Sequence, residues 1–385
     1  MPGYELIDKS EFKEISEIFK KSKILCRMGF DKLRSGVYKV RTFENLFAKF
    51  MHSKYALGVT SGTAALRVAL STIDLKPGDE IITQPFTFVA TVEAIIEARA
   101  TPVLAEIDET LNLDPNDLLK KITKKTKAVI VVHMLGVPAK LDKIKSICDK
   151  KNIALIEDTA WGCGGKYKKK YLGTWGRIGT FSFDHVKAIT TGEGGMVVFK
   201  NKNDFEKASA WHDHGHENNP KVPRWEDTRK GSGFNFRMNE MQGAVGIAQL
   251  KKLKFIIRKQ NENHDLIWDA IKTIPEITRR IYPKGSSISA DALIIFVKNK
   301  NKALACRNEL LKYKISTKIL PEAYTWHFAS TWTHMKELKK KHPKLKSSFH
   351  KSKQIIDKAV SIPIFVKMEK NLPKKIKNAI KKAIL

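Results

Sequence analysis

The feature that most constrains the fold of this chain is a regular alternation of short apolar runs with amphipathic segments between residues 55 and 158. Runs of about four to eight apolar residues predict buried strands, whereas apolar residues recurring every three or four positions predict helices. Strands that alternate with helices form a mainly parallel sheet, covered on both faces, with its site at the carboxyl ends of the strands. The sequence therefore predicts a three-layer α/β/α fold. The runs expected to be strands begin at residues 55, 81, 101, 128 and 153.

Two domains, or one large domain with an appendage, are expected from the length of 385 residues. We expect a large domain over residues 1–254, which starts with a helical arm, and a smaller C-terminal α+β domain over residues 255–385. In this second part the predicted elements are helices over 256–274, 303–313, 352–359 and 370–384 and a strand over 292–297.

The net charge of +31 is compatible with a nucleic-acid or anionic membrane partner. The lysines are spread through every segment, however, and no nucleic-acid-reading motif accompanies them. We interpret them as a solvated surface that steers acidic substrates. The four cysteines fit neither a disulfide nor a metal pattern, and no apolar run approaches the roughly 18 residues of a membrane span. The start of the chain does not resemble a signal peptide, so the expected location is the cytoplasm.

One lysine, Lys187, lies in a short polar segment between an apolar run that ends at Phe183 and the glycine turn 192–195. A lysine amine that burial holds near neutrality forms Schiff bases with aldehydes. In a chain with 71 Lys+Arg, the simpler interpretation of any single lysine is a surface position. The choice between the two depends on motifs that lie upstream.

Three upstream motifs follow predicted strands. Residues 61–64 open a helix, and its free backbone N–H groups and dipole suit a phosphate, although an ordinary serine N-cap would look the same. Phe88 follows the next strand and offers an aromatic platform. Asp158 ends a strand whose apolar residues would bury its carboxylate, which then needs a cationic or hydrogen-bonding partner. The alternative for Asp158 is a cap on the following turn.

Together these features are what an enzyme needs to hold pyridoxal phosphate. Residues 61–64 would anchor the phosphate, Phe88 would stack on the ring, Asp158 would keep the ring nitrogen protonated, and Lys187 would bind the aldehyde. No resident metal is expected. His212, His214 and His216 alternate and could share a face as metal ligands, but we favour a role for some of them in the substrate pocket.

The motifs resemble those of the DegT/StrS sugar aminotransferases, a pyridoxal-phosphate-dependent family with the type I aspartate aminotransferase fold. The resemblance extends from about residue 4 to the C-terminus. Lys187 is retained where related dehydratases have histidine, which favours transamination. The matching segments are 61–66, 85–91, 132–136, 157–158, 181–187, 192–195, 214–215 and 233–238.

This resemblance implies a role for each matched residue. Lys187 would carry the cofactor and move the α-proton, and Asp158 would pair with the pyridine nitrogen. The resemblance also implies a homodimer with shared active sites, in which Asn235 of one subunit reaches the cofactor phosphate of the other. The cofactor phosphate would also be bound by Gly62, Thr63 and Ser182 of the same chain.

One position and three segments distinguish this chain within the family that it resembles. The family often has Gln or His three residues after the ring aspartate, where this chain has Trp161, and Trp cannot accept a hydrogen bond. Residues 1–6, 213–216 and 326–338 are most similar to the transaminases that make 8-amino-8-deoxy-Kdo for lipopolysaccharide. The similarity implies an acidic keto sugar as acceptor and glutamate as donor. The alternatives are a nucleotide-linked keto sugar, another pyridoxal-phosphate reaction such as dehydration, and a basic nucleic-acid-binding or regulatory protein.

Overall fold

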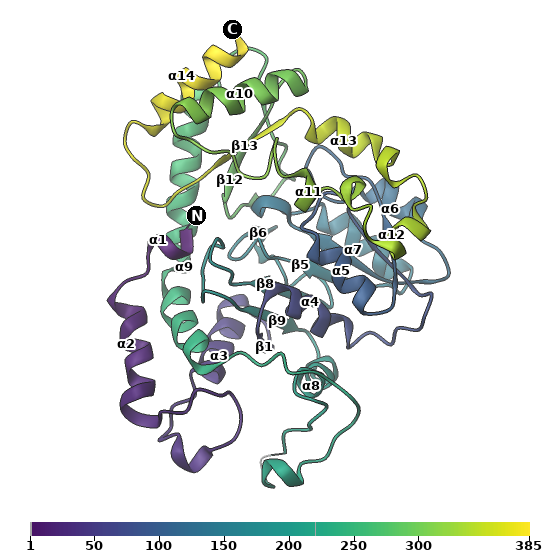
Figure 1. The fold of residues 1–385 in the computed structure, drawn as a ribbon, viewed down its shortest axis with the longest axis vertical. Helices are drawn as coiled ribbons and strands as arrows, with labels where there is room; N and C mark the ends of the chain where they lie inside the picture. Colours follow the sequence, from purple (N-terminus) through teal and green to yellow (C-terminus); the bar gives the residue numbers. More distant parts are fainter. Residues whose placement is uncertain (1, 220) are drawn as a thin grey trace.

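A computed structural model describes residues 2–219 and 221–385. Met1, where one of the matched segments begins, therefore lies outside the described residues. A seven-stranded sheet occupies the centre, with the order β1-β9-β8-β5-β4-β2-β3 (Figure 1). All neighbours from β3 to β8 are parallel, and β9 is antiparallel to both β8 and β1. The strands are β1 (Tyr55–Val59), β2 (Glu80–Thr83), β3 (Thr101–Leu104), β4 (Thr126–Val132), β5 (Ala154–Asp158), β8 (Ile178–Ser182) and β9 (Gly195–Phe199).

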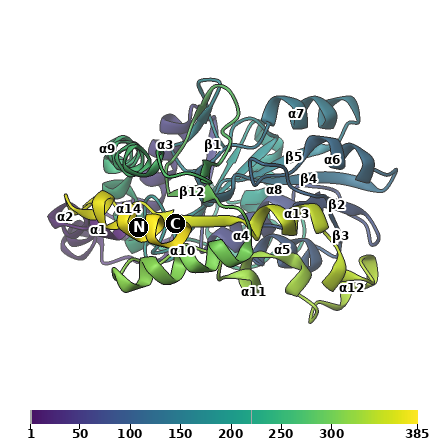
Figure 2. The same cartoon turned by 90° about the horizontal axis from the view of Figure 1, so that it is seen from above.

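Helices cover both faces of this sheet, as Figure 2 shows from above. The alternation within β4 sends Ile130 into one apolar cluster, with residues of α4 and α5, and Val129 and Val131 into another, with residues of α6 and α7. The predicted α/β fold with a mainly parallel sheet is confirmed. The covering helices include α4 (Gly62–Leu70), α5 (Ala90–Glu97), α6 (Pro115–Lys121), α7 (Leu141–Lys150) and α8 (Lys202–Trp211).

The C-terminal part begins along one long helix, α9 (Glu240–Ile271), which includes most of the helix predicted over 256–274 and starts well before it. The predicted domain border at residue 254 stays a prediction and falls inside this helix. A second sheet, with the order β10-β12-β13, packs against α10 and α14 in a separate apolar cluster. These elements are β10 (Thr278–Arg279), β12 (Ala292–Phe296), α10 (Lys300–Lys312), β13 (Ala359–Pro363) and α14 (Leu372–Ile384).

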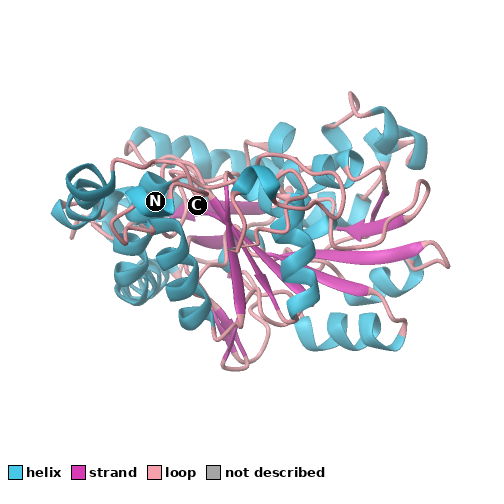
Figure 3. Ribbon diagram, turned by 90° about the horizontal axis from the view of Figure 1, so that it is seen from below, coloured by secondary structure: helices cyan, strands magenta, loops and turns pink. Residues whose placement is uncertain are grey.

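Shorter elements complete the chain, and Figure 3 shows how helices lie on both sides of the strands. The expected helix over 352–359 is shorter than predicted, because Ala359 already pairs with Phe296 in the second sheet. No helix among the described residues combines the length and apolarity that a membrane span requires. The remaining regular elements include α11 (Tyr324–His327), α12 (Lys336–Lys341), α13 (His350–Ile356) and a small sheet of β6 (Lys166–Tyr167), β7 (Lys170–Tyr171) and β11 (Ser286–Ser287).

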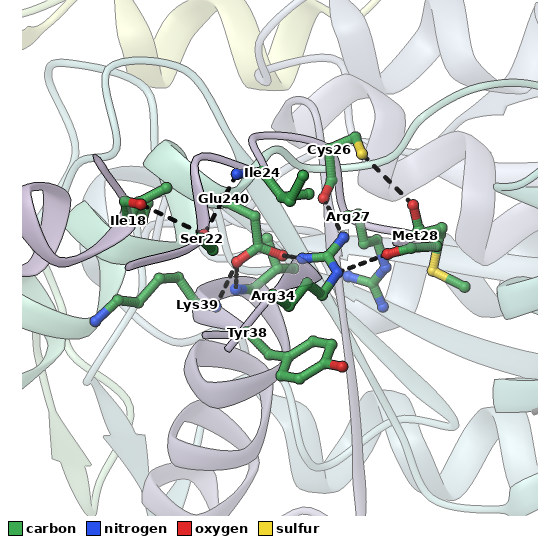
Figure 4. Close-up of polar contacts among 12 residues, drawn as sticks. Ile18, Ser22, Ile24, Cys26, Arg27, Met28, Arg34, Tyr38, Lys39 and Glu240 are labelled. Atoms are coloured by element: carbon green, nitrogen blue, oxygen red, sulfur yellow. Dashed lines mark hydrogen bonds and ion pairs between the residues drawn. The ribbon is translucent and has the colours of Figure 1, made fainter. Parts of the chain in front are cut away.

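The N-terminal arm contains α1 (Pro2–Glu5), α2 (Lys9–Glu17) and an irregular stretch that leads to α3 (Lys39–Met51). A buried ion pair fixes this stretch to the start of α9, as Figure 4 shows. The Glu240 carboxylate accepts hydrogen bonds from Arg34 Nη1 at 3.2 Å and from the backbone N–H of Lys39. Arg34 also donates from Nε to the carbonyl oxygen of Gly29 at 2.7 Å. The irregular stretch between α2 and α3 is thus held by specific buried contacts.

Candidate active site

The structure brings six of the seven predicted site residues to one cavity of about 480 Å³, here called the active-site cavity. Asn235 lies outside this cavity, in an exposed segment before α9. Side chains that the sequence did not assign to the site also contribute to its wall, among them Trp161, Trp326 and His327. The six predicted residues are Gly62, Thr63, Phe88, Asp158, Ser182 and Lys187.

One end of the cavity is formed by the N-terminus of α4. Ser61 caps this helix, because its Oγ accepts a hydrogen bond of 3.0 Å from the N–H of Ala64. The first N–H groups of a helix have no partner inside the helix, so those of Gly62 and Thr63 are available to an anion. A Cβ added to Gly62 would lie 2.7 Å from the Cβ of Ser182, which means that only glycine allows this close approach of helix and strand. The ordinary capping role and the phosphate-binding role are compatible here.

The carboxylate of Asp158 lies at the carboxyl end of β5, and the residue is only 6% exposed. Its Oδ2 accepts a hydrogen bond of 3.0 Å from Thr91 Oγ1, and its Oδ1 accepts one of 3.2 Å from the N–H of Ala160. The turn-capping alternative is therefore also realised. Burial nevertheless raises the pKa of Asp158, which shows that two neutral donors do not compensate for the desolvation of this carboxylate. A cationic N–H donor in the cavity would do so.

Lys187 lies on the connection between β8 and β9, and its amine faces the indole of Trp161 at 3.3 Å from the ring centre. Burial, and next the positive charge of Lys318, lower the pKa of Lys187 to about 8. A far larger fraction of this amine is neutral at physiological pH than of an ordinary lysine. After the glycine turn the chain enters β9, which pairs antiparallel with β8, so Lys187 lies on a strand-to-strand connection.

A segment from the C-terminal part covers the cavity beside Phe88. The backbone N–H groups of Thr87 and Val89 donate to the carbonyl oxygens of His327 and Trp326, each at 3.0 Å. The ring of Phe88 lies 5.9 Å from that of Trp326 and 5.5 Å from that of His327. Burial lowers the pKa of His327 to about 4, so this imidazole is neutral. The sequence did not assign these residues to the site, and only the resemblance of residues 326–338 to related transaminases pointed to them.

The three alternating histidines, His212, His214 and His216, do not share one set of contacts. His212 Nδ1 lies 2.5 Å from the carbonyl oxygen of Ser209, whereas His216 Nδ1 lies 3.2 Å from Asp227. None of the three, His214 included, lines the active-site cavity of its own chain. Within residues 2–219 and 221–385, no group of three or more His, Cys, Asp or Glu side chains could hold a metal ion.

Comparison with known proteins identifies the family of this chain. The sequence profile of the DegT/DnrJ/EryC1/StrS aminotransferase family matches residues 19–381. The chain belongs to this family. Its cofactor is pyridoxal phosphate. GDP-perosamine synthase of Escherichia coli O157:H7 is 38% identical over 239 residues, which are 62% of this chain and 64% of that enzyme, so the match spans less than two thirds of its length.

Solved structures of aminotransferases match almost the whole fold. An aminotransferase from Psychrobacter cryohalolentis has a TM-score of 0.86 at 27% identity, covering 98% of this chain and 96% of that one. Helicobacter pylori PseC, an aminotransferase involved in the biosynthesis of pseudoaminic acid, has a TM-score of 0.83 at 26% identity, covering 98% of this chain and 97% of that one. The family and fold predicted from the sequence are confirmed.

The residues of the cavity fit the family's cofactor. The open helix end suits its phosphate, the buried carboxylate of Asp158 lacks a cationic donor, and the amine of Lys187 is largely desolvated. One cavity is therefore lined by a site for an anionic phosphate, a carboxylate for a cationic ring nitrogen and an amine that can react with an aldehyde.

Proposed function

We propose that this chain is a pyridoxal-phosphate-dependent transaminase that moves an amino group from glutamate to a keto sugar during the biosynthesis of a cell-surface polysaccharide. The observation that carries the proposal is that Lys187, Asp158 and the N-terminus of α4 line the same cavity. The charges of Asp158 and Lys187 are costly to hold in this cavity without a ligand of matching charge, and the open end of α4 offers free N–H groups to an anion. The proposed location is the cytoplasm, where nucleotide sugars and free keto sugars are made.

Different residues of this chain would have different roles in the reaction. When bound, pyridoxal phosphate supplies an aldehyde and an electron-withdrawing ring that stabilises negative charge on the substrate carbon. The N–H groups of Gly62 and Thr63 and the hydroxyl of Ser182 would bind the phosphate. The ring of Phe88 would stack on the pyridine ring. Asp158 would keep a proton on the ring nitrogen by accepting its N–H. The Nζ of Lys187, released by the donor amine, would carry the proton removed from the α-carbon.

For the acceptor we favour an acidic keto sugar, 8-oxo-Kdo, with 8-amino-8-deoxy-Kdo as the product. The support is the similarity of residues 213–216 and 326–338 to enzymes with that activity, together with a net charge of +31 that attracts anions. The second candidate is a nucleotide-linked keto sugar, which is favoured by the 38% identity to a GDP-perosamine synthase. Dehydration is the third, and the retained Lys187 argues against it.

The experiment that tests the activity is half-reaction spectroscopy followed by product analysis. The purified holoenzyme should change its visible spectrum when glutamate is added, release 2-oxoglutarate, and recover its first spectrum when the correct keto sugar is added. Lys187→Ala should abolish the change, whereas Lys169→Ala, an exposed lysine on a surface turn, should not. Offering 8-oxo-Kdo and a GDP-linked 4-keto sugar separately decides between the acceptors. A spectrum that glutamate leaves unchanged would refute transamination from this donor.

We also propose a homodimer with shared active sites. Asn235 is exposed, and so are Trp225 at 85% and Phe234 at 58% on the same projecting segment. Large exposed aromatic side chains are frequent in interfaces between subunits. A second copy of the chain would cover them and bring Asn235 to the phosphate end of its neighbour's cavity.

Mixing two inactive variants tests this arrangement. If Asn235 acts across the interface, refolding Lys187→Ala together with Asn235→Ala should restore about a quarter of the wild-type activity, since half of the dimers are then mixed and each has one intact site. If Asn235 acts within its own chain, the mixture should stay inactive. Sedimentation of each variant alone controls for loss of the dimer.

A further inference from the structure

Close to the ring of Trp161 lies a buried ion pair, Lys318–Asp291, that the family assignment does not explain. Lys318 Nζ contacts both carboxylate oxygens of Asp291 at 2.7 Å, and the two residues are 7% and 4% exposed. Neither residue lines the active-site cavity. Both come from the C-terminal part, more than a hundred residues after Lys187 in the sequence. A buried ion pair rarely gains stability over apolar residues of similar volume, so its presence needs another reason.

The geometry of Trp161 connects this pair to Lys187. The amine of Lys318 lies 4.6 Å from the centre of the Trp161 ring, and the amine of Lys187 lies 3.3 Å from the same centre. Two ammonium groups therefore share one indole, and their separation is less than the sum of these two distances. At such range in a protein interior, like charges repel appreciably.

The same part of the chain also fixes the backbone and ring of Trp161. Ser289 Oγ donates a hydrogen bond of 2.8 Å to the Trp161 carbonyl oxygen. The indole belongs to an apolar cluster with Ala292 and Ile319, the neighbours in sequence of Asp291 and Lys318. The unusual Trp161 is thus held by the C-terminal part of the chain, at the place where family members often have Gln or His.

We propose that Lys318 is a positioning residue for Lys187: held by Asp291, it fixes the Trp161 ring against the reactive amine and adds a second positive charge that keeps this amine nucleophilic. The inference rests on the proposed function only in taking Lys187 as the reactive amine. Asp291 acts in the opposite sense, because its negative charge favours the protonated form of Lys187. The ion pair therefore sets the proton affinity of Lys187 by the balance of two charges.

Other charged groups also face the Lys187 amine, and their contributions are separable. Asp184 and Asp158 favour the protonated form, whereas His327 is neutral and lies on the covering segment. Lys318 is the cation that opposes them. Changing Lys318 or Asp291 leaves all of these other groups in place.

Competitive labelling of cofactor-free protein tests the proposal. The rate at which an amine reagent modifies Lys187 is measured from about pH 6 to pH 10 by peptide mass spectrometry, which reports the pKa of that amine alone. Lys318→Met should raise the midpoint and reduce labelling at pH 8 about fivefold, as expected when loss of a nearby like charge moves a pKa near 8 by roughly one unit. Asp291→Asn should lower the midpoint. Midpoint shifts of opposite sign in the two variants would show that the charges of Lys318 and Asp291 act on the Lys187 amine. A merely structural role would not produce shifts of opposite sign.

Two further variants keep the test decisive. Removing one member of a buried ion pair destabilises a protein strongly, so the double variant Lys318→Met/Asp291→Asn, which buries no unpaired charge, is measured as well. Its midpoint should lie between those of the single variants. Lys341→Met, which breaks an ion pair with buried Glu80 outside the cavity, should leave the midpoint unchanged. Equal midpoints in all folded variants, or shifts of the same sign, would overturn the proposal whether or not the protein transaminates a sugar.

Discussion

The backbone N–H of Gly3 donates a hydrogen bond of 3.1 Å to the carbonyl oxygen of Lys187, so the first turn of the chain holds the backbone of the proposed reactive residue. The ring of Tyr4 stacks on His185 at a centroid distance of 4.8 Å. The Glu5 carboxylate accepts a hydrogen bond of 2.8 Å from the N–H of Lys367 in the C-terminal part. The N-terminal turn therefore joins the Lys187 segment to the C-terminal part.

Gly3→Ala should disturb the contact between the N-terminal turn and the Lys187 segment. The added Cβ would lie 2.9 Å from the carbonyl oxygen of Lys187 and 2.9 Å from the backbone nitrogen of Thr190, both backbone atoms that cannot turn aside. The Lys187 segment would have to shift, and a misplacement of about 1 Å lowers turnover by up to roughly a hundredfold. We expect kcat to fall while the unfolding transition moves little. Phe12→Ala, on the exposed face of α2, is the control and should leave kcat unchanged.

Asp158→Asn should separate activity from stability. Burial raises the pKa of Asp158, so the carboxylate destabilises the cofactor-free fold, and a neutral amide of the same shape removes this burden. We expect the cofactor-free variant to unfold at an equal or higher denaturant concentration. Its turnover should nevertheless fall by about a hundredfold or more, because an amide does not hold a proton on the ring nitrogen. Normal turnover would show that Asp158 is only a turn cap.

Local sequence pattern could identify the site residues that lie in the first half of the chain. Asp158 and the Ser61 cap were predictable because Asp158 ends one apolar strand and Ser61 lies two residues after the end of another. Lys187 was predictable from its polar surroundings between an apolar run and a glycine turn, but the antiparallel pairing of β9 with β8 and β1 was not, since β9 looks like any other buried strand in sequence. The family resemblance supplied the roles that local pattern left open.

The C-terminal contributions could not be predicted. Lys318 is one lysine in a chain with 71 Lys+Arg, and nothing near it in sequence shows that it meets Asp291 or Trp161. The contact of Gly3 with Lys187 likewise joins residues that are far apart in the chain. Such pairings are set by how the second sheet and the N-terminal arm pack on the first, which local periodicity does not encode.

Glu240→Gln should be strongly destabilising. Glu240 is 1% exposed, pairs with the fully buried Arg34, and accepts from the backbone N–H groups of Lys39 and Val40. The amide leaves the Arg34 charge uncompensated, and breaking a buried ion pair costs about 3 kcal/mol or more. Urea unfolding should show this loss. Glu262→Gln, on the exposed part of the same helix, should change the free energy of unfolding by less than about 0.5 kcal/mol.

The desolvated amine of Lys187 should give the cofactor-free protein a specific pH dependence of stability. Its pKa is about 8 in the folded chain, against 10.5 as an ordinary lysine. Below pH 8 the amine is charged in both states, so folding bears the full penalty of burying the charge. Between pH 8 and 10.5 the unfolded chain binds more protons than the folded one, and stability therefore rises with pH.

Lys187→Met removes this titration and leaves every other lysine in place. The variant should be more stable than the wild type below pH 8, and its advantage should shrink as the pH rises toward 10.5. Denaturant unfolding of both cofactor-free proteins at several pH values measures the difference, in which the titration of the surface lysines cancels. Lys169→Met should follow the wild type at every pH, because this lysine is exposed. A Lys187→Met advantage that does not vary with pH would mean that the amine is not held near neutrality by burial, and that its reactivity depends on the cofactor alone.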